Sequence, residues 1–257
     1  MISTEREANE FLYLAMDVGE QMLKSGAEVS RVEDTIQRIC TSFGAERVDV
    51  FTITSSIVVT MYNPEFGPVT QTRRISGQEL DLHRLEKLNQ LSREICEGKL
   101  KIEEIKYRME RILQTNTYSF VTQLMIFALI SGSFSLFFGG SIRDAIASAM
   151  VGVLLKCLIS LQKILKINVF LAILTTSFLG GVLAIAYVRI GIGETSAKIS
   201  IGNIMLLIPG LALTNALRDM FSGDTISGAL RFTEAILTAV TVAFGFAVAA
   251  FIGGALV

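Results

Sequence analysis

The sequence predicts an α-helical polytopic membrane protein with an N-terminal cytosolic α+β domain. Hydrophobic residues make up 51% of the 257-residue chain, but its charges are unevenly distributed. Of the 47 Asp, Glu, Lys and Arg residues, 34 lie before Tyr118 and 13 follow it. We therefore expect a cytosolic domain over residues 1–117 that ends in a helical neck, and a transmembrane domain over residues 118–257.

Five apolar stretches follow the charged region, and each approaches the ~20 residues that a membrane-spanning helix requires. Backbone polar groups must be satisfied internally in lipid, so each stretch is expected to be a helix. The five expected transmembrane helices cover residues 118–139, 142–161, 167–190, 199–217 and 232–252.

Basic residues near the ends of these stretches predict the orientation of the chain. Five spans place one group on the side of residues 1–117: Lys99, Lys101, Lys106, Arg108, Arg111, Lys163, Lys166, Arg218 and Arg231. The opposite side receives fewer: Arg143, Arg189 and Lys198. Because cytoplasmic segments carry an excess of Lys and Arg, we expect the N-terminus inside and the C-terminus outside.

Residues 1–117 show helical periodicity first and strand-like composition afterwards. Helices are expected over residues 4–24 and 28–43, with Gly26 and Gly44 at their ends. The β-branched and aromatic run over residues 51–62 suits a strand, and residues 69–75 suit its partner across a turn at 63–68. Two further helices are expected over residues 79–96 and 101–113.

Composition excludes several classes of function. A net charge of −1 gives no basic face for nucleic acid. The acidic start shows no secretory signal, and Cys40, Cys96 and Cys157 have no metal-binding spacing, so we expect reduced, structural thiols. The single histidine, His83, lies in a charged helical stretch and suits a solvated helix face. We expect no enzyme, no catalytic residues, no metal and no cofactor.

The most distinctive polar cluster of the N-terminal domain surrounds the expected start of the second helix. It contains Gly26, Glu28, Arg31 and Glu33. Glu28 and Glu33 are expected to cap or brace this helix through Arg31, which we favour over a catalytic role.

The fourth apolar stretch is interrupted by Pro209 and Gly210. Proline removes a helical hydrogen bond and glycine does not stiffen the gap, so the helix is expected to break there. Broken helices in transporters expose backbone groups to a substrate or ion, although a simple kink is equally compatible with this pair.

Ionisable and polar residues near the break are candidates for a substrate or ion pathway. Charges inside a membrane are costly unless they are paired or hydrated, and are therefore functional candidates. Interfacial anchoring is the alternative, and Arg231 is positioned to pair with Glu234. The candidates are Asp144, Pro209, Gly210, Thr214, Asn215, Arg218, Asp219, Asp224 and Glu234.

Two motifs resemble the threonine/serine exporter family, and the similarity spans nearly the whole chain in the same order. The first is Ser25-Gly26-Ala27-Glu28-Val29-Ser30-Arg31-Val32-Glu33-Asp34-Thr35. The second is Leu207-Ile208-Pro209-Gly210-Leu211-Ala212-Leu213-Thr214-Asn215-Ala216-Leu217-Arg218-Asp219, followed by Ser222-Gly223-Asp224 and Gly228.

The resemblance implies a subunit of a secondary-active exporter of small polar metabolites in the plasma (inner) membrane. Threonine, serine and dicarboxylates such as succinate are the implied substrates, with a proton or another ion as the coupling species. Full-length relatives carry about twice as many spans, which implies a smaller membrane subunit as partner. A homo-oligomer is the other expected assembly, and membrane lipids surround the spans.

One alternative function stays open at this point. The chain could be a membrane-tethered cytosolic sensor or hydrolase-like domain that uses its spans as an anchor. The sizeable N-terminal domain favours this alternative. Five spans with a break disfavour it, because an anchor needs only one.

Overall fold

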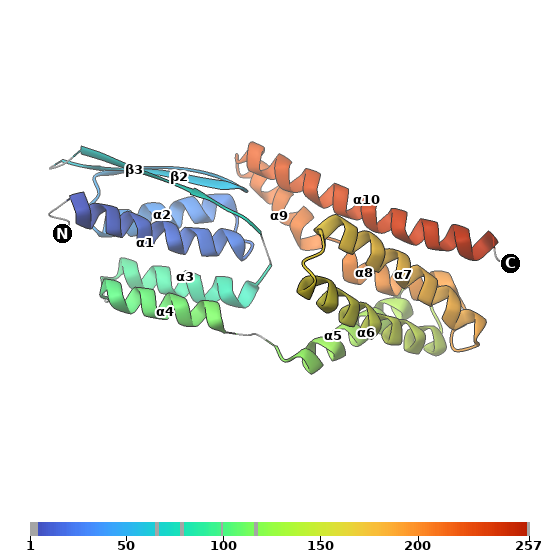
Figure 1. Ribbon diagram of the computed structural model, residues 1–257. Coiled ribbons are helices and arrows are strands. Elements are labelled where there is room, and N and C mark those ends of the chain that lie inside the picture. Colours follow the sequence, from blue (N-terminus) through green and yellow to red (C-terminus); the bar gives the residue numbers. More distant parts are fainter. Residues whose placement is uncertain (1–4, 65–66, 78–79, 99, 116–117, 256–257) are drawn as a thin grey trace. The chain divides into compact units, whose positions relative to one another are not determined.

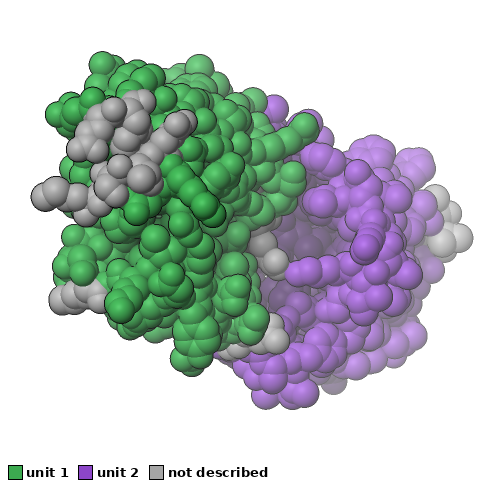
Figure 2. All heavy atoms as spheres, turned by 60° about the vertical axis from the view of Figure 1, so that its left-hand side comes forward, with its two compact units in different colours: residues 1–117, 214–232 green, residues 118–213, 233–257 purple. Residues whose placement is uncertain are grey.

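The computed structural model describes residues 5–64, 67–77, 80–98, 100–115 and 118–255. The chain forms two compact units (Figures 1 and 2). Unit 1 combines residues 1–117 with residues 214–232, and unit 2 combines residues 118–213 with residues 233–257. These units describe packing. The expected division into a cytosolic and a membrane domain at residue 117 stays a prediction.

Unit 1 contains three layers, a sheet and two pairs of helices (Figure 1). Helices α1 and α2 contact the sheet on one side and α3 on the other. The elements are α1 (Glu5–Lys24), α2 (Val29–Ser42), β1 (Arg47–Ile53), β2 (Ser56–Asn63), β3 (Gly67–Arg74), α3 (Leu82–Cys96) and α4 (Ile102–Gln114). The expected helices of the N-terminal region are therefore confirmed to within a few residues.

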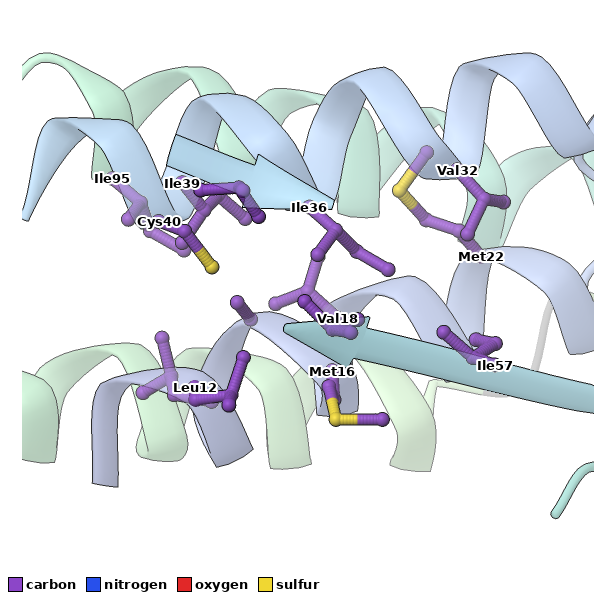
Figure 3. Close-up of a cluster of buried hydrophobic side chains, with 14 of the residues drawn as sticks. Leu12, Met16, Val18, Met22, Val32, Ile36, Ile39, Cys40, Ile57 and Ile95 are labelled. Carbon is purple, nitrogen blue, oxygen red and sulfur yellow. The ribbon is translucent and has the colours of Figure 1, made fainter. Parts of the chain in front are cut away.

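The apolar stripes of α1 and α2 face each other and form the core of unit 1 (Figure 3). Leu12, Val32 and Ile36 are fully buried there. The helices approach closely at Gly19, where an added Cβ would lie 2.5 Å from Ile36 Cδ1. Gly26 follows α1 with φ +92°, as the expected stop requires.

The sheet corrects one expectation. The run over residues 51–62 was expected to form one strand, but the chain turns at Thr54 and Ser55. It forms the antiparallel hairpin β1–β2, in which Ile53 pairs with Ser56. Polar Thr and Ser favour such a turn because their hydroxyls bond to nearby backbone groups. Strand β3 pairs antiparallel with β2, which gives the order β1-β2-β3.

Cys40 is buried, Cys96 is partly buried and Cys157 is exposed. Cys40, Cys96 and Cys157 are free thiols. Burial raises the pKa of Cys40 to about 12, so this thiol stays protonated and unreactive at neutral pH.

The second half of the chain is helical. Its elements are α5 (Phe120–Phe137), α6 (Ile142–Ile164), α7 (Val169–Arg189), α8 (Ser196–Leu207), α9 (Gly210–Phe221) and α10 (Thr225–Ala255). Within the described residues, four helices are long and apolar enough to cross a membrane, or five if α8 and α9 together form one span. These two helices meet at Pro209 with a bend of 49°. The expected break is confirmed, whereas the exact span count and the orientation stay predictions.

Small residues allow the helices of unit 2 to pack closely. An added Cβ on Gly152 of α6 would lie 2.9 Å from Phe127 O of α5. An added Cβ on Gly202 of α8 would collide with the Ser131 carbonyl oxygen. Without a hydrophobic force between helices in lipid, such close packing and polar contacts hold them together.

A buried polar layer joins three helices of unit 2. The hydroxyls of Ser131 and Ser148 lie 2.7 Å apart. The Ser131 hydroxyl donates to Asn203 Oδ1 at 2.8 Å, and Asn203 Nδ2 donates to Ile199 O at 2.9 Å. All three polar side chains are fully buried, so the layer specifies how α5, α6 and α8 fit together.

Candidate functional site

Two polar motifs that are about 190 residues apart in sequence meet inside unit 1. One surrounds the start of α2, together with Thr52 of β1. The other covers the end of α9, the turn after it and the start of α10. We call their contact the polar seam. Its members are Gly26, Ala27, Glu28, Val29, Glu33, Thr52, Asn215, Arg218, Asp219, Asp224, Ser227 and Arg231.

A buried ion pair lies at the centre of the seam. Arg231 Nη1 and Asp219 Oδ2 are 3.0 Å apart, and their side chains are only 7% and 1% exposed. Arg231 Nη2 also donates to the carbonyl oxygen of Ala27 at 2.9 Å. Asp219 Oδ2 makes no hydrogen bond with the described residues, so its contact with Arg231 is an ion pair alone. A buried charge is costly without a counter-ion, so each of these charges depends on the other.

Asp219 also completes the N-terminus of α2. The residue before this helix, Glu28, makes no side-chain capping bond. The backbone N–H of Val29, the first residue of α2, instead donates to Asp219 Oδ1 at 3.4 Å. A carboxylate is favoured there by the unpaired N–H groups and the dipole of the helix. The start of α2 is thus completed by a residue from α9.

Two further contacts connect α9 to the chain before α2. Asn215 Nδ2 donates to the carbonyl oxygen of Gly26 at 3.4 Å. The guanidinium of Arg218 forms an ion pair with Glu28. The expected brace of α2 through Arg31 is therefore wrong for Glu28, which pairs with α9 instead.

The start of α10 contacts the sheet of unit 1. Ser227 Oγ donates to the carbonyl oxygen of Thr52 at 3.2 Å, and the Thr52 N–H donates to Glu33 Oε1 at 2.7 Å. Glu33 therefore also bonds away from Arg31. Burial raises the pKa of Glu33, and the charge of Asp224 raises it further, while the Thr52 N–H acts in the opposite direction.

The seam contains polar atoms whose hydrogen-bonding capacity is unused. Asp224 Oδ2 and Arg231 Nε are buried without a hydrogen-bond partner among the described residues. Buried polar groups are normally satisfied, and an exception calls for a specific explanation such as strain or a functional role. The seam could therefore accommodate a proton at its acidic groups and a polar ligand at its guanidinium.

A tight turn brings the two helices of the seam together. The Asp224 N–H donates to the carbonyl oxygen of Asp219 at 3.0 Å. Gly223 in this turn has φ +101°, which other residues rarely adopt. Gly228 then lets α10 approach α9, because an added Cβ would lie 2.7 Å from Met220 N and 2.8 Å from Ala216 O.

Several predicted pathway residues are not members of the polar seam. Pro209 and Gly210 form the break between α8 and α9 and belong to unit 2. Thr214 and Glu234 are exposed. The expected pairing of Arg231 with Glu234 is wrong, because Arg231 points to Asp219.

Asp144 has a different, structural environment within unit 2. Its carboxylate accepts from the backbone N–H groups of Glu194 and Thr195 at 2.7 and 2.8 Å. It also forms a capping box with Ser141 at the start of α6. Asp144 therefore joins two loops and shows no unused hydrogen-bonding capacity.

Sequence reasoning missed part of the seam. Thr52 and Ala27 contribute backbone atoms, which leave no signal in residue type. Ser227 was inconspicuous because a lone serine is common in membrane helices. Arg31 was included in the motif, but its exposed side chain lies in a groove between α2 and α3.

Within the described residues, no group of three or more His, Cys, Asp or Glu side chains could hold a metal ion. The expectation of no metal and no cofactor stays a prediction. The described side chains of the seam offer ion pairs, hydrogen bonds and carboxylate protonation.

The fold and the seam define a class of protein. It is a multi-pass helical membrane protein with a broken helix pair and an α+β unit that contains the polar seam. Comparison with known families identifies it further. The chain matches the family described as "Putative threonine/serine exporter" over residues 13–253, and it belongs to this family.

A curated relative supports the assignment. The chain is 23% identical over 248 residues to a threonine/serine exporter of Corynebacterium glutamicum. This similarity covers 87% of the chain and 47% of the relative, so the chain spans about half the length of that relative. No solved structure matches the chain. The family indicates a transporter rather than an enzyme.

Proposed function

We propose that this chain is a subunit of a secondary-active exporter that moves threonine- and serine-type amino acids out of the cell across the plasma membrane. The polar seam carries the proposal. In a membrane-tethered sensor or enzyme, the charged motif that follows the broken helix pair would have no role inside the soluble unit. An exporter needs such a connection, because substrate must pass from a soluble compartment into the helices.

The seam has the chemistry to handle an amino acid. A zwitterion carries one carboxylate and one ammonium group. Arg218 and Arg231 offer guanidinium groups for the carboxylate, and Asp224 and Glu33 offer oxygen atoms for the ammonium. The same acidic groups are suited to exchange a coupling proton, since burial already disfavours the charged form of Glu33.

The proposed topology places the N-terminal α+β part of unit 1 in the cytoplasm, with the C-terminus outside. Its support is the excess of Lys and Arg on one side of the spans. In this arrangement the seam lies at the inner end of the transport route. Substituted-cysteine labelling at exposed positions on each side would test the topology.

We further propose that a smaller membrane subunit completes the transporter, with a homo-oligomer as the other assembly to test. The support is that the C. glutamicum exporter is about twice as long as the similar region. Dicarboxylates such as succinate are the second substrate class to test, since guanidinium groups bind any carboxylate.

Counterflow in proteoliposomes tests the proposal. Vesicles containing the chain, with and without a co-purifying small membrane protein, are loaded with unlabelled threonine, serine or succinate. We expect labelled threonine or serine to accumulate. The Arg218→Gln variant should reduce accumulation about tenfold or more, because an ion pair of the seam is lost. The control Arg38→Gln, which removes an exposed pair on α2, should transport normally.

The outcome separates the candidate functions. Accumulation of succinate alone would assign the dicarboxylate class. Absence of counterflow for all three substrates in both preparations would contradict the exporter and favour the tethered sensor or enzyme.

A further inference from the structure

A second polar feature of unit 1 lies away from the seam, between α3 and α4. These antiparallel helices lie side by side (Figure 1) and enclose a groove of about 390 Å³. This volume is within the range of small-ligand sites, about 300–1,000 Å³. The side chains that line it are His83, Arg84, Lys87, Gln90, Leu91, Glu94, Arg108, Arg111, Ile112 and Thr115.

The charges of this groove are unbalanced. Among its described lining residues, four are Arg or Lys and one, Glu94, is acidic. Arg108 is already neutralised, because it pairs with Glu94 and with Glu104 at 2.6 Å. The remaining cations, Arg84, Lys87 and Arg111, give the groove a net positive charge.

Two of these cations have unused capacity for an anion. No ion pair involves Lys87 or Arg111 within the described part of the chain, and both side chains are exposed. Arg84 forms an ion pair with Asp81 at 3.6 Å, and its Nε atom is buried without a hydrogen-bond partner there. An anionic ligand would bind Lys87 and Arg111 without displacing an existing ion-pair partner.

The groove cations other than Arg108 lie at one end of the groove. Because α3 and α4 are antiparallel, the start of α3 lies beside the end of α4. Arg84, Lys87 and Arg111 are therefore near Thr115, whereas the Arg108–Glu94 pair lies toward the opposite end. Only four residues separate Thr115 from Phe120, where the first candidate span begins, so the chain between these two residues reaches at most about 18 Å.

An exposed aromatic side chain accompanies the cations. Tyr107 is 59% exposed, and the Arg111 guanidinium lies 5.9 Å from the centre of its ring. Tyrosine and basic residues together are typical of the membrane–water interface. In the proposed topology this part of the chain lies on the cytoplasmic side, where the membrane leaflet carries anionic phosphodiester headgroups.

We propose that the groove between α3 and α4 binds the phosphate of an anionic lipid headgroup. The bound lipid would hold the soluble part of unit 1 at the membrane surface, independently of substrate transport through the seam. Soluble phosphate has the same chemistry, but the short chain connection from Thr115 of the groove to the first candidate span favours the lipid.

Hydrogen exchange of the full chain in nanodiscs tests this inference. We compare discs of phosphatidylcholine with discs that also contain roughly 30% phosphatidylglycerol, which supplies the anionic headgroup. Amide exchange in α3 and α4 should slow at least about fivefold in the anionic discs, since fivefold is the effect expected for a single basic residue at an anionic surface. A separate sample of neutral discs receives inorganic phosphate.

Two matched double variants locate the effect. Lys87→Gln with Arg111→Gln removes two groove cations and should abolish the slowing. Arg93→Gln with Lys106→Gln removes the same charge from the same helices outside the groove and should retain it. Circular dichroism in neutral discs checks that both variants fold.

Each remaining outcome overturns the inference. Equal exchange rates in both disc types would show that the groove does not bind anionic lipid. Slowing that survives in the Lys87/Arg111 variant, or disappears in the Arg93/Lys106 variant, would indicate a diffuse charge effect. Slowing by inorganic phosphate in neutral discs, with none from phosphatidylglycerol, would assign the groove to a soluble anion.

Discussion

Asp144 in unit 2 and Asp219 in unit 1 are both almost fully buried, at 2% and 1% exposure, but their surroundings differ. Asp144 accepts hydrogen bonds from two loop N–H groups and from Ser141. Asp219 has one longer bond, from Val29 at 3.4 Å, and depends on Arg231 for its charge compensation.

The difference separates a structural carboxylate from a functional candidate. Asp144 accepts one backbone bond from Ser141 at its own helix start and two from the N–H groups of Glu194 and Thr195, in the loop before α8. The partners of Asp219 come from α2 and α10, and the ion pair with Arg231 supplies its charge compensation. A change in the position of α9 or α10 would therefore alter the environment of Asp219, whereas Asp144 is held by backbone groups of two loops within unit 2.

The largest expected effect comes from Asp219→Asn. The substitution leaves Arg231 charged and buried without its counter-ion, which typically costs about 3–5 kcal/mol. We expect a lower melting temperature and the loss of export in cells that still contain the protein. The double variant Asp219→Asn with Arg231→Gln should recover part of the stability. If the single variant melts normally, Asp219 and Arg231 do not form the pair described.

Asp144→Asn tests the prediction that Asp144 has a structural role. It weakens two charge-assisted bonds to Glu194 and Thr195, and hydrogen bonds to charged groups contribute about 1.5–3 kcal/mol each. We expect a destabilisation of about 2–3 kcal/mol. Export per folded molecule should be unchanged, measured as transport normalised to the amount of protein in the membrane. A selective loss of export would place Asp144 in the pathway.

Gly228→Ala tests the close approach of α9 and α10 in the seam. The new methyl would collide with Met220 and the Ala216 carbonyl, and overpacking costs about 1–3 kcal/mol. The matched control is Gly210→Ala, because an added Cβ there meets nothing within 4 Å. Thermal unfolding in detergent should show a loss only for Gly228→Ala. Equal melting temperatures would contradict the packing described.

The raised pKa of Glu33 predicts a pH dependence of stability. Burial makes the protonated form more favourable in the folded state, so its stabilising effect is complete below the unfolded pKa of about 4.3. This effect is lost as pH rises through the raised folded pKa. Glu33→Gln mimics the protonated form and should flatten the melting temperature above that pH. The exposed control Asp34→Asn should leave the profile unchanged.

Glu234→Gln should have the smallest effect on stability, below about 0.5 kcal/mol, because its side chain is exposed. We nevertheless expect reduced export, since an acid in a membrane helix is a candidate for the ion pathway. Export assays and membrane fractionation together measure both properties. Normal export would remove Glu234 from the mechanism.

Much of the secondary structure was predictable because the sequence patterns that indicate it are local. The α1 and α2 stripes follow the helical period, and Gly26 and Gly44 adopt the positive φ expected at helix ends. The break at Pro209 follows from a missing N–H. The hairpin between β1 and β2 was missed because the run over residues 51–62 is apolar on both sides of its turn.

Many residues of the candidate site were predictable from the sequence, but their contacts were not. Asn215, Arg218 and Asp219 were chosen for their polarity in an apolar context, and all three belong to the seam. Their partners were not foreseen. The i, i+3 spacing suggested Glu234 for Arg231, whereas the turn at Gly223 brings Asp219 of the previous helix within 3.0 Å.

The sequence by itself determined which segments are helices, which are apolar enough for a membrane, and to which family the motifs are similar. Those properties depend on the period of apolar residues and on the free energy of burying each segment. Only the tertiary structure decided that residues 214–232 pack with the N-terminal part and that α2 is capped by Asp219. Such contacts form when elements that are far apart in the sequence pack together. No local sequence pattern predicts the partner of a buried charge.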